Sequence, residues 1–391
     1  MNVNTDKEIM TEITLKKKIF FYFLAIICIF ILVEITLQGI HLVKRQVRKK
    51  TGNTRAYLSP YADCPWAKEY FKEHDKLEIV FEPYYGWRKQ EFRGKYINIS
   101  PEGVRRTWNP EFPNSEEVKT VFCFGGSVLW GSGARDDFTI PSYLSKYLNR
   151  EHSKFRVINY GEPAYTFTQE IVYFILLLKE GKIPDYVIFF DGVNDIYAAF
   201  QSGRTGVTHN LASMRKKLTT STSDLLKEKL KNKVLNSILT LKALHKLFYG
   251  KQKYEEIPNV AGSFYNESEL ASLARKVVED YRKNVHLVES LAKAYNFRCF
   301  FIWQPVIFNT TSLTAEELAN ADLKNKKMVF FFQEVERIIR QENIDNFYNF
   351  STIFDNKDKT IFIDFAHLSE EGNEIVAKKM NQLLEGSINH E

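Results

Sequence analysis

The stretch 118–127, VKTVFCFGGS, is the part of the chain from which the fold is best interpreted. Apart from one lysine, its first seven residues are apolar, aromatic or β-branched, as in a strand buried on both faces. Gly125 and Gly126 then permit a tight turn, and Ser127 follows where a helix can begin. The stretch therefore predicts a buried strand whose carboxyl end exposes a serine.

Four more buried strands and a series of helices are predicted after this one. The strands are short runs rich in β-branched or aromatic residues, at 155–160, 186–190, 299–303 and 347–350. Helical patterns lie at 140–149, 169–179, 270–294 and 322–341, and a last helix follows Ser369, a suitable N-cap residue. This alternation predicts an α/β fold with a parallel central sheet and helices on both faces.

A membrane signal lies near the N-terminus. Residues 19–33 are apolar throughout, which is shorter than the roughly 20 residues of a typical spanning helix. Lys16–Lys18 before the run and Glu34 and Gln38 after it can reach the two interfaces, so a single span is feasible. No A-x-A-like cleavage site follows the run, and we interpret residues 19–43 as a transmembrane signal anchor.

Composition excludes several classes of protein. The chain has 391 residues, 44% hydrophobic and 26% charged, and its mean hydropathy is −0.31. These values fit a globular chain and exclude a polytopic membrane protein. Four cysteines are too few for a disulfide scaffold in so long a chain. The net charge of +6 is concentrated near the N-terminus and in one central segment, so no nucleic-acid partner is predicted.

The chain divides into four predicted parts. Residues 1–18 form a tail, 19–43 the anchor, 44–114 a linker and an aromatic-rich lead-in, and 115–391 the main domain. In the lead-in, Tyr84, Tyr85 and Trp87 belong to an aromatic core or line a glycan groove, with core packing favoured. Residues 201–260 interrupt the main domain as a basic helical insertion. A helical hairpin docked on the core is slightly favoured over a lid or a membrane-surface helix.

Polar residues follow the predicted strands at the points where the strands end. Ser127 follows the first strand, Gly161 the second, and Asn194 and Asp195 the third. The segment 364–367, DFAH, comes after the fifth. Ligands of open parallel sheets bind beyond the carboxyl ends of the strands, so these groups are expected to converge on one edge.

These residues supply each part that a serine esterase needs. Ser127 can attack an ester carbonyl, while His367 takes its proton and Asp364 orients the imidazole. The backbone N–H groups of Ser127 and Gly161 and the side-chain amide of Asn194 can donate to the oxyanion. No metal-binding cluster or phosphate-binding loop is recognisable, so no metal and no cofactor are predicted.

At these positions the sequence resembles the SGNH (GDSL) hydrolase superfamily. The matching segments are 124–127 (FGGS), Gly161, 192–195 (GVND) and 364–367 (DFAH), with Gln304-Pro305 as a further recurring feature. The resemblance covers residues 118–384 and implies a flavodoxin-like three-layer α/β/α fold. One departure is Gly126, which stands where many members have Asp.

We therefore expect a membrane-anchored SGNH-type esterase that hydrolyses acyl esters, favouring O-acetyl groups on cell-envelope carbohydrate. The alternatives are an O-acyltransferase that modifies a polysaccharide, a lysophospholipase or lipase, and a catalytically silent glycan-binding protein. The expected partners are an acylated carbohydrate or lipid and the membrane itself. Basic residues after the anchor outnumber those before it, which favours a cytoplasmic domain, whereas the resemblance favours a single-pass protein with its catalytic domain outside the cytoplasm.

Overall fold

The structure is a computed structural model that describes residues 3–51, 54–112, 118–150, 154–240, 260–321, 323 and 325–388. Several sequence predictions fall partly outside these residues, among them the domain boundary at 114–115, positions 322 and 324 of the helix at 322–341, and positions 241–259 of the insertion. The chain forms two compact units. One contains Met1–Gly52 and Ser213–Glu256, and the other contains Asn53–Ala212 and Ile257–Glu391.

The second unit is built on a five-stranded parallel sheet. Its strands, in spatial order, are β6 (Phe155–Asn159), β5 (Lys119–Gly125), β7 (Tyr186–Asp191), β8 (Arg298–Trp303) and β9 (Phe347–Asn349). Each lies within one or two residues of a predicted strand. The first two strands of the sheet in the chain exchange places in space, which is the flavodoxin-like order. The predicted fold class is therefore confirmed.

Stacked aromatic rings hold the middle of the sheet. Phe124, Phe189 and Phe301 are paired in register on β5, β7 and β8, and all three are fully buried. The centroids of neighbouring rings lie 5.1 Å and 6.1 Å apart, with the ring planes 16° from parallel in both pairs. This packing explains why the strand sequences are apolar on both faces.

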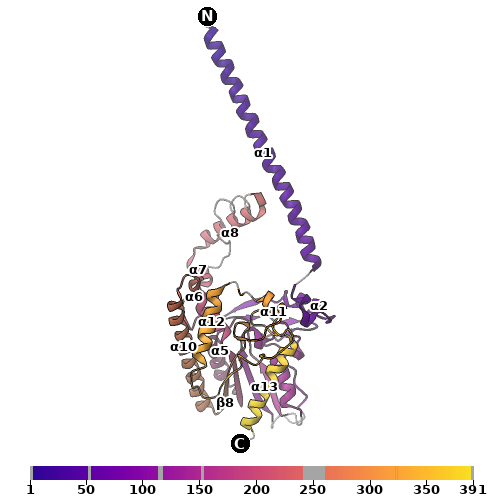
Figure 1. Ribbon diagram of the computed structural model, residues 1–391, viewed down its shortest axis with the longest axis vertical. Helices are drawn as coiled ribbons and strands as arrows, with labels where there is room; N and C mark the ends of the chain where they lie inside the picture. The colour runs from indigo at the N-terminus through magenta and orange to yellow at the C-terminus, as the bar shows by residue number, and fades with distance from the viewer. Residues whose placement is uncertain are drawn as a thin grey trace. The chain divides into compact units, whose positions relative to one another are not determined.

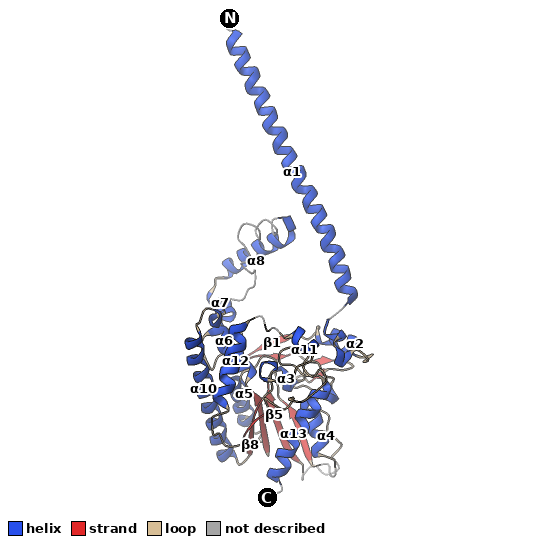
Figure 2. Cartoon of the chain, viewed as in Figure 1, coloured by secondary structure: helices blue, strands red, loops and turns tan. Residues whose placement is uncertain are grey.

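Helices cover both faces of the sheet (Figures 1 and 2). The helices α4 (Ile140–Leu148) and α13 (Glu370–Ile388) pack together on one face, and α5 (Phe167–Lys179), α10 (Glu267–Tyr295) and α12 (Lys326–Ile339) lie on the other. Right-handed crossovers between parallel strands produce this division. The hydroxyl of Ser369 accepts the N–H of Gly372 at 3.2 Å, as its predicted N-cap role requires.

Short elements connect these helices and strands. They are α3 (Ser127–Trp130), α6 (Val193–Ser202), α11 (Ala315–Asn320) and the 3-10 turns η4 (Asp136–Phe138), η5 (Ala261–Ser263) and η6 (Ile307–Asn309).

The lead-in contains helical turns as well as strands. Its elements are η1 (Thr54–Tyr57), η2 (Ser59–Tyr61), α2 (Ala67–His74) and two antiparallel pairs, β1 (Ile79–Glu82) with β2 (Gly86–Lys89) and β3 (Phe92–Arg93) with β4 (Asn98–Ile99). The sequence did not indicate α2. Tyr85 is buried, and Trp87 packs edge-to-face on Tyr165 at 5.6 Å, as aromatic packing predicts, while Tyr84 is exposed.

The first unit contains α1 (Val3–Thr51) and α8 (Thr222–Ser237), and α7 (Leu211–Thr219) lies at its border. Within α1, Lys17–Leu42 is long and apolar enough to cross a membrane. Glu34 on this helix accepts the N–H groups of Leu239 and Thr240 at 2.9 Å and 2.6 Å. This part of the insertion therefore contacts α1 directly.

Candidate active site

The predicted site residues lie at the carboxyl edge of the parallel sheet. Ser127 is the first residue of α3 and comes two positions after β5, and Asn194 is the second residue of α6, just after β7. Gly161 lies beside the turn at 125–127, which we call the nucleophile turn. A Cβ atom added to Gly161 would lie 2.9 Å from Trp130 N and 3.2 Å from Gly125 O. The structure thus brings together residues that are far apart in the sequence.

Ser127, His367 and Asp364 form a continuous chain of hydrogen bonds. His367 Nε2 lies 2.7 Å from Ser127 Oγ. His367 Nδ1 lies 2.9 Å and 2.7 Å from the two carboxylate oxygens of Asp364. A carboxylate can only accept at Nδ1, so Nδ1 carries the proton and Nε2 is left to accept the serine proton. This is the geometry of a serine nucleophile with a general base.

A tight turn presents Asp364 to His367. Asp364 Oδ1 accepts the backbone N–H groups of Ala366 and His367 at 3.1 Å and 2.9 Å, and Ile363 N–H donates to His367 O at 2.9 Å. Burial alone would raise the pKa of Asp364. The charge of His367 and the hydrogen bonds from His367 and Ala366 outweigh burial and hold the pKa well below its usual range. Asp364 is therefore a carboxylate at any pH at which the triad is used.

The three predicted oxyanion donors differ in their present partners. Gly161 N–H donates to Asn159 Oδ1 at 3.0 Å, and Asn194 Nδ2 donates to Tyr165 O at 2.7 Å. The amide of Asn194 has a second hydrogen that this bond does not use. The Gly161 N–H must share or exchange its bond with Asn159 to serve an oxyanion. Asn194 can thus donate to an oxyanion without giving up its present bond, whereas the Gly161 N–H cannot.

The surroundings of Gly126 explain why a glycine stands where many SGNH hydrolases have an aspartate. Its backbone is extended, with φ −75° and ψ −156°, which any residue can adopt. A Cβ built here would overlap Asn194 Nδ2, far inside the 3.0 Å limit of real contacts. A side chain at this position would displace the side-chain amide of Asn194 from the space that it occupies.

We expect Gly126→Ala to lower kcat by about 10- to 100-fold, because the new methyl group displaces the Asn194 amide from its place beside the nucleophile turn. Hydrolysis of a small acetyl ester by the full-length protein measures this effect. Gly386→Ala is the matched control, since a Cβ there meets nothing within 4 Å. An unchanged kcat in Gly126→Ala would show that this position of Asn194 does not matter.

Buried carboxyl groups lie behind Asn194. Asp195 accepts the N–H of Phe167 at 3.2 Å and so joins the first turns of α6 and α5. Burial raises the pKa of Glu170 and of Asp191, and repulsion between neighbouring carboxylates raises both further. Glu170 and Asp191 therefore keep their protons at pH values at which an exposed carboxyl group has lost its own. Gly192 precedes this segment with φ +121°, a conformation that favours glycine.

Glu162, next to Gly161, is a second buried carboxyl group. It is 3% exposed, and burial raises its pKa to about 8, although Lys89 N–H donates to it at 3.2 Å. The unfolded chain loses this proton near pH 4.5, so the folded state binds the proton more tightly. This group therefore favours the folded state at low pH, and its contribution is lost as the pH rises from about 4.5 to about 8.

We expect Glu162→Gln to remove this pH dependence. The free energy of unfolding of the wild type should fall by about 3 kcal/mol more than that of the variant between pH 5 and pH 8. Denaturant unfolding at the two pH values measures the difference. Glu279→Gln, which changes an exposed glutamate paired with Lys283, serves as the control. Equal pH slopes in Glu162→Gln and the wild type would contradict a neutral Glu162.

Two neighbours of the site carry no signal in the sequence. Arg55 Nη2 lies 3.2 Å from Asp364 Oδ2, across 309 positions of the chain. His209 Nε2 lies 3.1 Å from Asn194 O, and its ring stacks on Tyr197. Burial lowers the pKa of His209 to about 4, so it is a neutral packing group. Gln304 is buried, and among the described residues its side-chain nitrogen has no partner.

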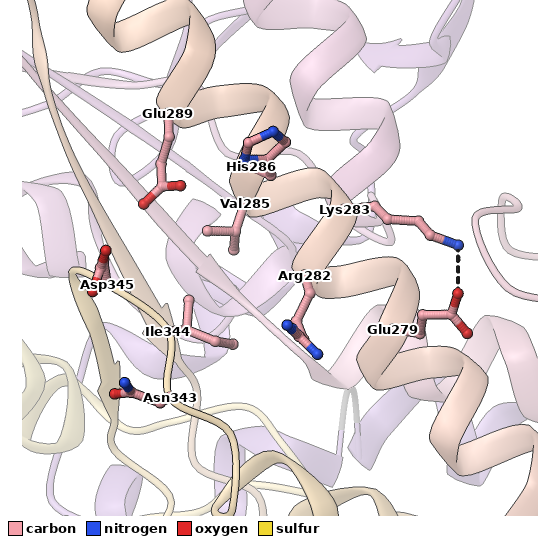
Figure 3. A pocket seen from close by; sticks show the side chains of 9 residues that line it. All are labelled: Glu279, Arg282, Lys283, Val285, His286, Glu289, Asn343, Ile344 and Asp345. Carbon is pink, nitrogen blue, oxygen red and sulfur yellow. Dashed lines mark hydrogen bonds and ion pairs between the residues drawn. The ribbon is translucent and has the colours of Figure 1, made fainter.

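A surface hollow of about 600 Å³ lies elsewhere, between α10 and the segment that enters β9 (Figure 3). Two of its charged residues, Glu279 and Lys283, are paired at 2.7 Å, and Arg282 binds Glu342, which does not line the hollow, at 3.1 Å. Asn343–Asp345 precede β9, so the hollow lies near the amino end of that strand, and the triad residues do not line it. Among the described residues, no group of three His, Cys, Asp or Glu side chains could hold a metal ion.

Comparison with known proteins shows the family of the chain. The sequence model of the GDSL-like lipase/acylhydrolase family matches residues 121–380, about two thirds of the chain. A search of curated proteins found no match.

Several solved structures are similar over most of their own length. An acetyl xylan esterase, AlAXEase, is 15% identical, covers 67% of this chain and 97% of its own, and has a TM-score of 0.36. A putative arylesterase from Agrobacterium tumefaciens is 13% identical, with 69% and 99% covered and a TM-score of 0.33. An inhibitor-bound aryl esterase from M. smegmatis is also 13% identical, with 69% of this chain and 99% of its own covered and a TM-score of 0.33.

Proposed function

The chain belongs to the GDSL-like lipase/acylhydrolase family and is a hydrolase of ester bonds, and from this premise we propose that Ser127 is its nucleophile, His367 its general acid and base, and Asp364 the residue that orients His367. The observation that carries the proposal is the 2.7 Å contact between Ser127 Oγ and His367 Nε2, with Nδ1 held by Asp364. Neither the family nor the fold alone would name these three residues.

The reaction follows from this geometry. Ser127 Oγ attacks the carbonyl carbon while His367 Nε2 takes the hydroxyl proton, and the N–H groups of Ser127 and Gly161 and the Asn194 amide stabilise the oxyanion. His367 then gives the proton to the leaving alcohol as its bond to the acyl carbon breaks. Water attacks the acyl-enzyme with His367 again as base, which releases the carboxylic acid and restores Ser127.

The proposed substrate is an O-acetyl or other short acyl ester on carbohydrate of the cell envelope. This proposal is supported by the membrane-length helix Lys17–Leu42, which would hold the catalytic unit close to envelope glycans. An acyltransferase would use the same triad with a sugar hydroxyl in place of water. A lysophospholipase would need a long acyl site, and a silent glycan-binding protein would need no activated serine.

Two assays on the full-length protein in nanodiscs separate these functions. A fluorophosphonate probe should label the wild type but not Ser127→Ala, because the probe reacts only with an activated serine. Small acetyl esters and acetylated oligosaccharides should then be cleaved faster than long-chain acyl esters. Absence of labelling would favour a catalytically silent binding protein. Transfer of acetyl to an added oligosaccharide without release of acetate would favour a transferase.

We propose a single-pass location in the cell membrane with the catalytic unit outside the cytoplasm. A reporter that works only after export, fused after Glu391, should then be active. Activity of only a cytoplasm-dependent reporter at the same position would reverse the orientation and with it the case for an envelope substrate.

A further inference from the structure

Arg55 connects the start of the lead-in to the triad. It lies in η1 (Thr54–Tyr57), and its guanidinium binds Asp364 Oδ2 at 3.2 Å, with the two side chains 37% and 21% exposed. Arg55 follows Thr51, the last residue of α1, by only four positions. The segment that leaves the membrane-length helix therefore reaches the acid of the triad directly.

The two oxygens of Asp364 are held in different ways. Oδ1 accepts the backbone N–H groups of Ala366 and His367. Oδ2 accepts His367 Nδ1 at 2.7 Å and Arg55 Nη2 at 3.2 Å. The turn itself thus contacts both oxygens, with its backbone N–H groups at Oδ1 and with the His367 ring at both. Arg55 adds a contact to Oδ2 from outside the turn.

The lead-in is anchored by the residues that follow Arg55, so this contact belongs to a packed region. Ala56 is buried, and Ser59 N–H donates to both carboxylate oxygens of Glu316 at 3.1 Å. Tyr61 Oη donates to Gly133 O at 2.7 Å, in the loop that follows the nucleophile helix. The same lead-in therefore packs on the loop after α3 and reaches Asp364.

We infer that Arg55 is a positioning residue of the triad, which holds Asp364 Oδ2 and whose positive charge extends the activity of the enzyme to lower pH. This inference rests on the proposed function of Ser127, His367 and Asp364. The charge acts as follows: a fixed cation beside Asp364 disfavours a second positive charge on His367, so the imidazole remains a competent base at lower pH.

The pKa values of the other ionisable groups around the pair, His74 and Tyr61, are set first by burial, and the charge of Arg55 is a lesser cause. Burial lowers the pKa of His74 to about 4 and raises that of Tyr61, so both are neutral. Glu370, at the start of α13, is already paired with Arg135 at 2.7 Å. Ser127 is neutral. A change in the pH profile on replacing Arg55 would therefore report the loss of its own charge.

The test compares kcat/KM against pH for Arg55→Gln, Arg55→Lys and the wild type, in full-length protein with a small acetyl ester. In Arg55→Gln the midpoint of the acid limb should move up by about 0.5 to 1 pH unit, and activity just below the wild-type midpoint should fall by about 3- to 10-fold. Arg55→Lys keeps the charge and should restore most of the midpoint. Arg337→Gln, which breaks the surface pair with Glu334, should leave the profile unchanged.

Each other outcome overturns the inference. An unmoved midpoint with lower activity at every pH would mean that Arg55 only supports the fold. A higher KM with an unmoved midpoint would mean that it binds substrate instead. The downfield proton signal of His367 Nδ1–H gives a readout that does not need turnover, and it should broaden in Arg55→Gln. If the wild type reacts with the fluorophosphonate no faster than Ser127→Ala does, the proposed function fails, whereas an unchanged signal in Arg55→Gln rejects only the role of Arg55.

Discussion

Ser127→Ala is expected to lower kcat for ester hydrolysis by about 10⁴- to 10⁶-fold, and His367→Ala by a similar factor. The reason is that the two residues act as one unit: without the base Ser127 keeps its proton, and without the hydroxyl the base has nothing to activate. The double variant should therefore be little worse than either single variant. Hydrolysis of a small acetyl ester by the full-length protein measures all three.

A matched control separates this loss from damage to the fold. Ser290→Ala removes a hydroxyl that lies on the surface of α10 and donates within its own helix, to His286 O at 2.9 Å. It should keep full activity, and Ser127→Ala should unfold at nearly the same temperature as the wild type. Substantial turnover by Ser127→Ala, or losses in the single variants that multiply in the double variant, would contradict a Ser127–His367 pair.

The sheet could be predicted from the sequence because its strands are buried on both faces. A segment such as Tyr186–Asp191 is apolar at nearly every position, which distinguishes it from the amphipathic helices on either side. The triad could be predicted because the carboxyl ends of parallel strands meet at one edge, which places Ser127 and the 364–367 turn together. Both inferences use patterns that lie within short stretches of sequence.

The other features of the site depend on contacts that no short stretch reveals. Arg55 resembles any arginine in a polar segment until the fold brings it to Asp364. The Gly161 N–H could be named as an oxyanion donor, but its bond to Asn159 arises from the local course of the chain after β6. Glu170 lies in the first turn of α5, where an acidic residue is ordinary, and only the folded structure shows that it is fully buried.

Asn194→Ala is expected to lower kcat by about 100- to 1000-fold while KM changes little, because an oxyanion donor acts on the charge that develops in the transition state. The structure holds the amide by its bond to Tyr165 O at 2.7 Å, so the donor is in place before the substrate arrives. Asn194→Asp keeps the shape of the side chain but replaces the donor with a negative charge, and it should be slower than Asn194→Ala. Measurement of kcat and KM for both variants distinguishes the possible roles. A rise in KM with kcat retained would mean that Asn194 binds the ground state, and equal rates for the two variants would mean that its amide does not face the oxyanion.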